Sequence, residues 1–165
     1  MQIPTRRKET YVKPKPDPYL TEAKFEELKN KLATMKRRHP ALCQEVKHLA
    51  EMGDFSENAG YQLAKGRLRS LNSRIAELEI QLRDAIVFHP DQDGRIGLGS
   101  RVTVETETGA RKDYTILGSV ETDPSSGVIS HNSPLGAALL GHRAGETAEL
   151  DLGGRKKLFR ILSVN

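Results

Sequence analysis

Two runs of apolar residues, spaced alternately three and four apart, most constrain how this chain can fold. The first run follows Thr21, a suitable N-cap, and consists of Phe25, Leu28, Leu32, Met35, Leu42, Val46 and Leu49, with His39 in its one gap. The second consists of Tyr61, Ala64, Leu68, Leu71, Ile75, Leu78, Leu82 and Ala85. This spacing is that of a coiled-coil seam. The connection between the runs is too short for a parallel return, so residues 19–87 are predicted to form an antiparallel helical hairpin.

Pro40 lies inside the first run. It removes one backbone hydrogen bond and is expected to kink the helix near residues 36–39 without ending the register. At about 1.5 Å per residue, a helix of about thirty residues puts the turn roughly 45 Å from the base of the hairpin. The turn is therefore the tip of a rod.

Outside the hairpin the chain divides into three further segments. Residues 1–18 are rich in proline, lysine and arginine and are predicted to be a flexible basic tail, which either is simply solvated or adheres weakly to anionic surfaces. Residues 88–98 carry the turn chemistry of a linker. Residues 99–165 form short predicted strands over 101–106, 114–118, 128–130, 147–152 and 158–164, with a short helix over 133–140.

The predicted fold class is therefore α+β with two domains, the second small and mostly antiparallel. Composition agrees, because aromatic residues are 5% and charged residues 29% of a chain of 165 residues. The net charge of +4 is modest and mixed in sign, so it does not by itself indicate nucleic acid. A single cysteine, the lack of a membrane-length apolar run and the lack of a signal peptide favour a cytoplasmic protein.

The turn carries two carboxylates, Asp54 and Glu57. An Asp followed by Glu three residues later is a capping pattern for the second helix. Asn58 and Glu51 add further oxygen donors, and oxygen ligands suit Mg²⁺, which commonly takes one or two protein carboxylates. Two carboxylates alone bind Mg²⁺ poorly, but they become useful where metal and phosphate are already present. Both interpretations remain open on the residues alone.

Four basic residues follow the turn, with no acidic residue from 58 to 76: Lys65, Arg67, Arg69 and Arg74. Their spacing divides them between the two flanks of the seam. They are either a solvated coiled-coil face or contacts to a nucleic-acid backbone, since phosphates are bound by Lys and Arg without base specificity. No phosphate-binding loop, calcium loop or metal-spaced histidines are present, and no Ser-His-Asp set can be assembled without the fold. Nothing in the sequence resembles a self-contained active site.

Two segments of the sequence contain recognisable motifs. The first runs from Gly53 through Asp54, Phe55, Ser56, Glu57 and Asn58 to Ala59, followed by Tyr61 and residues 65–69. The second runs from Ile129 and Ser130 through Ser133, Pro134, Leu135 and Gly136 to Gly141. Both segments resemble the GreA/GreB family of bacterial transcript cleavage factors, and the two-part layout is similar across residues 20–164. Pro40 and the basic run at 65–69 look closer to the GreB branch.

The resemblance implies a C-terminal domain with the FKBP-like fold, a partner and a chemistry. This domain docks at the rim of the secondary channel of RNA polymerase through Ser133, Pro134 and Leu135, and the hairpin enters the channel. Asp54 and Glu57 help hold the second Mg²⁺ of the polymerase, and Ser56 and Asn58 shape the tip. The 3′ segment of the nascent RNA is held by Lys65, Arg67, Arg69 and Arg74. The polymerase remains the catalyst, so this chain is expected not to be an enzyme. It is also expected to be a monomer and to have no cofactor of its own.

Two departures from the family and two rival functions remain. Gly60 stands where family members commonly carry an acid, and Gly66 is a poor helix former, costing about 1 kcal/mol relative to Ala. One rival is a regulator that blocks the channel without stimulating cleavage. The other is a coiled-coil chaperone or a prolyl isomerase built on the C-terminal fold, and such an enzyme needs an aromatic-lined pocket. Tyr114 and Phe159 are the only aromatic residues after residue 99, so such a pocket is expected to be hard to build.

Overall fold

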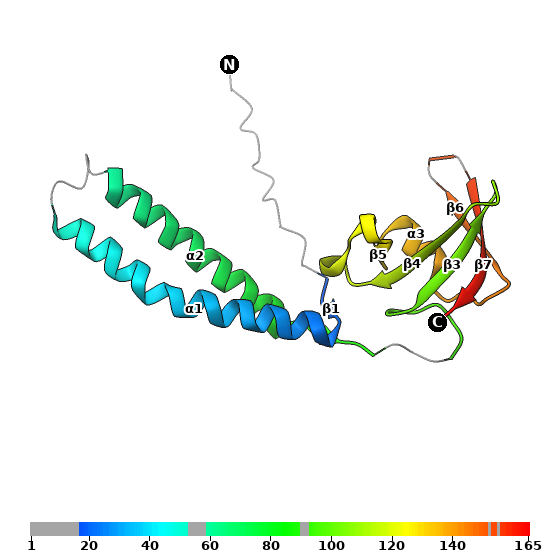
Figure 1. The fold of residues 1–165 in the computed structure, drawn as a ribbon, viewed down its shortest axis with the longest axis horizontal. Helices are drawn as coiled ribbons and strands as arrows, with labels where there is room; N and C mark the ends of the chain where they lie inside the picture. Colours follow the sequence, from blue (N-terminus) through cyan, green and yellow to red (C-terminus); the bar gives the residue numbers. More distant parts are fainter. Residues whose placement is uncertain (1–16, 53–58, 90–92, 152, 155) are drawn as a thin grey trace, which may run out of the picture.

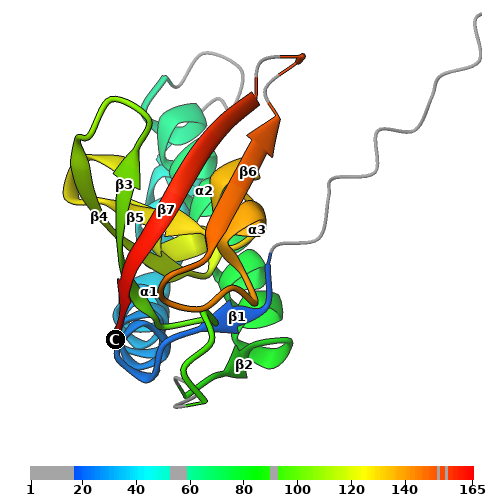
Figure 2. The ribbon, with the colours of Figure 1, turned by 90° about the vertical axis from the view of Figure 1, so that its right-hand side faces the viewer.

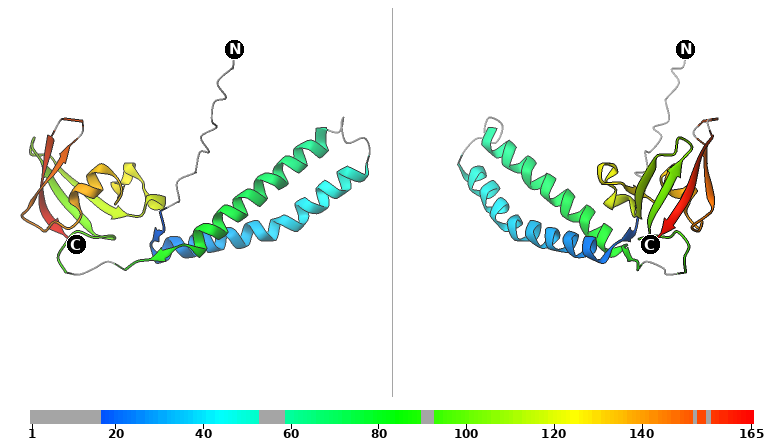
Figure 3. Two further views of the ribbon diagram at one scale, coloured as in Figure 1. Left: turned by 180° about the vertical axis from the view of Figure 1, so that it is seen from behind. Right: turned by 45° about the vertical axis from the view of Figure 1, so that its right-hand side comes forward.

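The computed structural model describes residues 17–52, 59–89, 93–151, 153–154 and 156–165. They form a long two-helix hairpin and a small domain built on a curled sheet (Figure 1). The hairpin projects away from the sheet domain in both views of Figure 3. This confirms the predicted α+β architecture. None of the helices in the described part of the chain is long and apolar enough to cross a membrane.

The hairpin consists of α1 (Glu22–Glu51) and α2 (Ala59–Arg83), which run antiparallel. Thr21 caps α1, since its side chain accepts a hydrogen bond from the Lys24 N–H. The helix passes through Pro40 without a break and bends along its length (Figures 1 and 3). The predicted register is therefore kept, because one proline removes one backbone bond and leaves the rest of the seam in place.

Ion pairs across the seam agree with its antiparallel register. Lys36 of α1 reaches Glu79 of α2 at 2.6 Å, and Glu45 reaches Arg67 at 3.8 Å. All four side chains are about half exposed, so each pair contributes at most about 1 kcal/mol. The seam itself supplies most of the stability, although only Leu28, Ala64 and Leu78 are buried in the two helices.

A two-stranded parallel pair joins the base of the hairpin, and the sequence did not predict it. β1 (Tyr19–Leu20) pairs with β2 (Ile86–Val87). Strands of two residues are too short for any periodicity to appear. Leu20 is fully buried with Leu28 and Leu78, and Val120 of the sheet domain packs on the same cluster. The base of the hairpin is therefore packed against the second domain.

The sheet domain contains five strands in the order β5-β4-β3-β7-β6. These are β3 (Arg101–Thr106), β4 (Arg111–Leu117), β5 (Val128–Ser130), β6 (Thr147–Asp151) and β7 (Lys156–Val164). β4 and β5 are parallel, and the other pairs are antiparallel. The short helices η1 (Ser119–Glu121) and η2 (Pro124–Ser126) join β4 to β5, and α3 (Pro134–Leu139) follows β5. α3 lies on the face of the sheet nearer the hairpin (Figures 1 and 2).

The core of this domain lies between that face and α3. Val102 and Val104 of β3 and Ile161 of β7 are fully buried, as alternation along a strand requires, and Leu139 of α3 closes over them. Ile96 is 2% exposed in the same core. It comes from the segment predicted to be a linker, so the sheet domain begins earlier than the glycines of that segment indicated.

The predicted strands agree with the structure except at polar ends. β4 begins at Arg111 and β7 at Lys156, both earlier than predicted. Their first residues are charged and exposed, and they take strand geometry by pairing with Glu105 and Asp151. A pattern of apolar residues cannot detect strand ends that lie in solvent.

Gly66 is the weak point of α2, and its replacement provides a first test of the hairpin. A Cβ at this position would have no atom within 4 Å. Gly66→Ala is therefore expected to stabilise the chain by about 1 kcal/mol, because Ala loses less backbone entropy in a helix. A urea titration monitored by helical circular dichroism measures the effect. Unchanged or reduced stability would show that α2 is not a regular helix at this residue.

Candidate functional site

The acidic residues predicted to be the site lie outside the described residues. Asp54, Ser56, Glu57 and Asn58 belong to the segment 53–58 that joins α1 to α2. The structure describes the two helix ends on either side, which lie at the end of the hairpin far from the sheet domain (Figure 1). α1 has 30 residues, which at 1.5 Å each is about 45 Å. Among the described residues, no group of three or more His, Cys, Asp or Glu is placed to hold a metal ion.

The four basic residues of α2 do not share one environment. Arg67 and Arg74 line a groove between the helices, whereas Lys65 and Arg69 do not. The Lys65 ammonium lies 5.5 Å from the centre of the Tyr61 ring, a cation–π arrangement. The predicted division between flanks is consistent with this placement, because residues three, four and seven apart share one helix face.

The groove has a volume of about 560 Å³ and is formed equally by both helices. Its lining residues are Arg38, Ala41, Leu42 and Glu45 from α1, and Arg67, Ser70, Leu71 and Arg74 from α2. Each set follows the spacing of three, four and seven that places residues on one helix face. The antiparallel register sets the two faces side by side.

Arg38 is the basic residue of this groove that sequence reasoning missed. It lies 29 positions before Arg67 in the chain, so no local pattern connects the two. Arg38 can be found from the sequence if the two runs are aligned as antiparallel seams and the residues beside each seam position are compared. The sequence signal was therefore present, but only in combination with the hairpin geometry.

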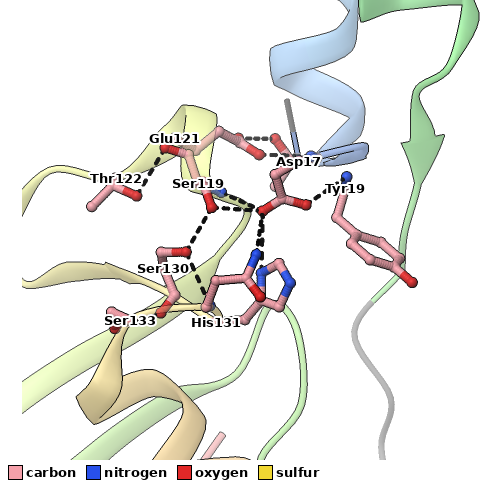
Figure 4. A network of polar contacts seen from close by, with 10 residues as sticks. Asp17, Tyr19, Ser119, Glu121, Thr122, Ser130, His131 and Ser133 are labelled. Carbon is pink, nitrogen blue, oxygen red and sulfur yellow. Dashed lines mark hydrogen bonds and ion pairs between the residues drawn. The ribbon is translucent and has the colours of Figure 1, made fainter. Parts of the chain in front are cut away.

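A second polar cluster fixes the base of the hairpin to the sheet domain (Figure 4). The Asp17 side chain is 4% exposed. Its Oδ2 accepts hydrogen bonds from Ser119 N at 2.7 Å and from Ser119 Oγ at 2.8 Å, and its Oδ1 accepts one from Tyr19 N at 3.2 Å. His131 Nδ1 lies 3.3 Å from Oδ2 without making a hydrogen bond. This carboxylate therefore ties the chain before α1 to the segments before and after β5.

Glu121 makes the second set of contacts in this joint. Its two carboxylate oxygens accept hydrogen bonds from Thr21 N at 2.9 Å and from Thr21 Oγ1 at 2.5 Å. Thr21 is also the N-cap of α1, so η1 of the sheet domain holds the first turn of the hairpin. Asp17 and Pro18, assigned by composition to the flexible tail, take part in this structure, since Pro18 O accepts a hydrogen bond from Ile86 N.

The pKa of Asp17 makes the joint sensitive to acid. Burial raises this pKa. Hydrogen bonds from Ser119 and Tyr19, together with the nearby His131, lower it by more than burial raises it, so the pKa lies below the usual value of 3.8. A lowered pKa in the folded state means stabilisation that is complete above about pH 5 and is lost as the pH falls through the folded pKa. The carboxylate therefore stabilises the joint at neutral pH.

Asp17→Asn is expected to destabilise the chain by about 1–3 kcal/mol at pH 7, because an amide cannot reproduce the charge-assisted bonds. The difference between wild type and variant should shrink as the pH falls from 5 to 3, where the wild-type carboxylate takes up a proton. Urea unfolding at several pH values measures this difference. A difference independent of pH would mean that the charge of Asp17 does not contribute. Asp113→Asn, which changes an exposed carboxylate of the sheet domain, serves as the control.

The three residues predicted to dock on a partner are placed at the start of α3. Ser133 caps the helix, since its Oγ accepts from Gly136 N at 3.0 Å, and it donates to Ser130 O at 2.6 Å. Leu135 packs on the core of the sheet domain. Pro134 is exposed. Of the three, Pro134 therefore offers the most surface, while Ser133 and Leu135 hold it in position.

A cavity of about 440 Å³ lies at the outer end of the sheet, between the β3–β4 turn and the start of β7. Tyr114 and Phe159 both line it, although the sequence indicates that an aromatic-lined pocket is hard to build. They share it because Val102 pairs with Tyr114 and Thr106 with Phe159, which sets both rings on one face of the sheet. Lys112, Lys157 and Glu107 also line the cavity.

Comparisons with known proteins cover nearly the whole chain. The family description "Transcription elongation factor, N-terminal" matches residues 18–87, and "Transcription elongation factor, GreA/GreB, C-term" matches residues 91–165. Transcription elongation factor GreA of Mycoplasmopsis pulmonis is 38% identical over 151 residues, which cover 89% of this chain and 94% of that protein. GreA of Thermomicrobium roseum is 38% identical over 133 residues, covering 79% of this chain and 85% of that protein.

Among solved structures, the GreA factor homolog 1 (Gfh1) protein of Thermus thermophilus is 30% identical, with a TM-score of 0.43 over 90% of this chain and 99% of that one. The closer resemblance to the GreB branch is not confirmed, because the relatives named here are GreA proteins. Both family descriptions and both relatives agree on the wider family. The chain therefore belongs to the GreA/GreB family of transcription elongation factors.

Proposed function

We propose that this elongation factor binds RNA polymerase through its secondary channel and stimulates hydrolytic cleavage of nascent RNA in backtracked or arrested complexes. The observation that carries the proposal is the position of the two helix ends. Glu51 and Ala59 lie at the far end of the hairpin, since α1 is about 45 Å long and α2 about 37 Å long (Figure 1). A segment held between them can reach a site too narrow for the sheet domain.

In this proposal, Asp54 and Glu57 supply carboxylates to a second Mg²⁺ in the polymerase. Their oxygen donors fit Mg²⁺, and two carboxylates leave room for water and phosphate oxygens to complete the coordination. When bound, the metal stabilises the attacking and leaving oxygens of the displacement. Ser56 and Asn58 shape the segment that carries the two acids. The polymerase is the catalyst, and the factor raises the rate of a reaction that the polymerase performs alone.

The remaining predicted residues bind the partners. Four basic side chains of α2 are exposed, three of them in its first half and one just past its middle: Lys65, Arg67, Arg69 and Arg74. At these positions they can contact RNA phosphates. Pro134, with Ser133 and Leu135 behind it, contributes to docking on the polymerase. The factor acts as a monomer in the cytoplasm.

Transcription complexes stalled with radiolabelled RNA test the proposal. Addition of the purified full chain with Mg²⁺ is expected to shorten the RNA faster than Mg²⁺ alone, and the shortened RNA should extend again when nucleotides are supplied. If the protein binds the polymerase and only slows it, the channel-blocking function is correct instead. If it binds no polymerase, the proposed partner is wrong.

A further inference from the structure

The inner face of the five-stranded sheet, which carries the core, continues into the cavity at the outer end of the sheet. Lys112 is two residues before Tyr114 on β4, and Lys157 is two residues before Phe159 on β7. Both aromatic residues belong to the core or pack on it, and side chains two apart on a strand share one face. The two lysines therefore lie on the core face, at the end of the sheet away from the hairpin (Figures 1 and 3).

The two faces of the sheet differ in how their lysines are paired. On the outer face, Lys156 lies 2.6 Å from a carboxylate oxygen of Glu149. On the inner face, neither Lys112 nor Lys157 lies within 4 Å of a carboxylate oxygen of any residue that the structure describes. Two ammonium groups without an acidic partner line one cavity, which favours an anion there, and lysine binds phosphate as a point charge.

Glu107 adds a hydrogen-bond acceptor to the same cavity. Its Oε1 accepts a hydrogen bond from Leu158 N at 2.9 Å, which fixes the side chain beside the start of β7. Within the described part of the chain, Oε2 has no hydrogen-bond or ion-pair partner. A carboxylate repels a bare anion but accepts hydrogen bonds from hydroxyl groups, as acidic residues do from ribose. The cavity therefore suits an anion that also carries hydroxyl groups.

Tyr114 and Phe159 supply apolar surface for a flat ring. Tyr114 is half-buried, so part of its ring is open to the cavity, and Phe159 is 8% exposed beside it. Planar bases gain from contact with aromatic side chains, whichever base is present. A volume of about 440 Å³ is within the range that holds a small ligand. A nucleotide combines the anion, the hydroxyl groups and the flat ring in one molecule.

We propose that this cavity binds a free nucleoside diphosphate. Its phosphates lie against Lys112 and Lys157, its ribose hydroxyls donate to Glu107, and its base lies against Tyr114. The nucleotide is a bound ligand and is not chemically changed. The inference goes beyond the proposed function, because the cavity lies at the end of the sheet domain away from the hairpin and shares no residue with the sites assigned to RNA or polymerase.

Titration calorimetry of the full chain with ADP, at low salt and without Mg²⁺, measures the binding. Pyrophosphate supplies the phosphates without the base, adenosine supplies the base without the phosphates, and 2′-deoxy-ADP lacks one hydroxyl. Wild type is expected to bind ADP at least about tenfold more tightly than either fragment, because charge and ring contacts act together. The loss of one hydrogen bond should make 2′-deoxy-ADP bind about threefold more weakly than ADP.

The chain offers a matched control for each lysine. Lys157→Gln and Lys112→Gln each remove a cation from the cavity and should weaken ADP binding about five- to tenfold. Their neighbours Lys156 and Arg111 pair with acids on the outer face, so Lys156→Gln and Arg111→Gln should change it less than about twofold. All four side chains are exposed, so these variants are expected to fold.

Glu107→Gln tests the contact to the ribose. Gln keeps an oxygen that can accept from Leu158 N, but it lacks the charge that strengthens a bond from a hydroxyl group. This variant should bind ADP and 2′-deoxy-ADP with nearly equal affinity. A preference for ADP as large as that of wild type would overturn the assignment of Glu107.

Four results would overturn the proposal as a whole. They are no detectable binding of ADP, equal affinity for ADP and pyrophosphate, equal losses in a cavity variant and its neighbouring control, and displacement of ADP by an RNA of ten nucleotides. Equal affinity for pyrophosphate would mean that the lysines hold any small anion. Displacement by RNA would mean that the cavity holds part of a nucleic acid and not a free nucleotide.

Discussion

The Asp54→Asn substitution is expected to reduce stimulated RNA cleavage roughly a hundredfold or more while leaving polymerase binding nearly unchanged. Asn is as good an N-cap as Asp, so the amide preserves any capping of α2. It removes the negative charge that a metal ligand needs, and losses of this size follow when a group that stabilises developing charge is removed. The substitution therefore distinguishes a capping role of Asp54 from a metal-binding role, which the residues alone leave open.

The measurement is the cleavage rate at saturating factor, together with the factor concentration at half-maximal effect. Asp84→Asn, the same change near the base of the hairpin, is the control and should retain the wild-type rate. Glu57→Gln is expected to behave like the Asp54 variant, since Gln also satisfies a capping box. Wild-type cleavage by both variants would leave these acids with a capping role only.

The Gly118→Ala substitution is expected to break the joint between hairpin and sheet domain, at a cost of about 2–3 kcal/mol. Gly118 has an ordinary extended backbone, with φ −65° and ψ 157°, so no special conformation requires glycine here. Glycine is needed because there is no room for a side chain. A Cβ on residue 118 would come far inside van der Waals contact of the Tyr19 carbonyl oxygen. The clash is with backbone, which cannot rotate away as a side chain can.

Hydrogen exchange locates the damage in this variant. The N–H groups of Thr21, Ile86 and Ser119, which are hydrogen-bonded at the joint, should lose protection, whereas those of Val104 and Ile161 in the sheet should keep it. Gly97→Ala is the control, because a Cβ at Gly97 has no atom within 4 Å. Unchanged exchange at the three joint amides would show that the chain accommodates the methyl group and that the approach is looser than described.

Much of this fold was predictable from the sequence, and for local reasons. The two helices follow from seams whose spacing repeats over many residues, and α3 from the Ser133 cap followed by Pro134. β3 and β5 coincide with their predicted bounds. In each case the pattern that identifies the element spans neighbouring residues along the chain, so composition and spacing record it directly.

The joint and the pockets depended on contacts between distant residues. Asp17 meets Ser119 across 102 positions, and Tyr114 shares a cavity with Phe159 through strand pairing. A two-residue strand such as β1 carries no periodicity, and a proline-rich composition concealed the structural role of Asp17.

By itself, the sequence determined that the chain is a hairpin with two acids between its helices, because seam spacing and the tip residues are local properties. It also determined the basic character of α2. Only the tertiary structure decided that Arg67 and Arg74 share a groove with Arg38, while Lys65 and Arg69 do not. The physical reason is that a groove forms between two helix faces, and which faces meet depends on how the seams align when the chain folds back on itself.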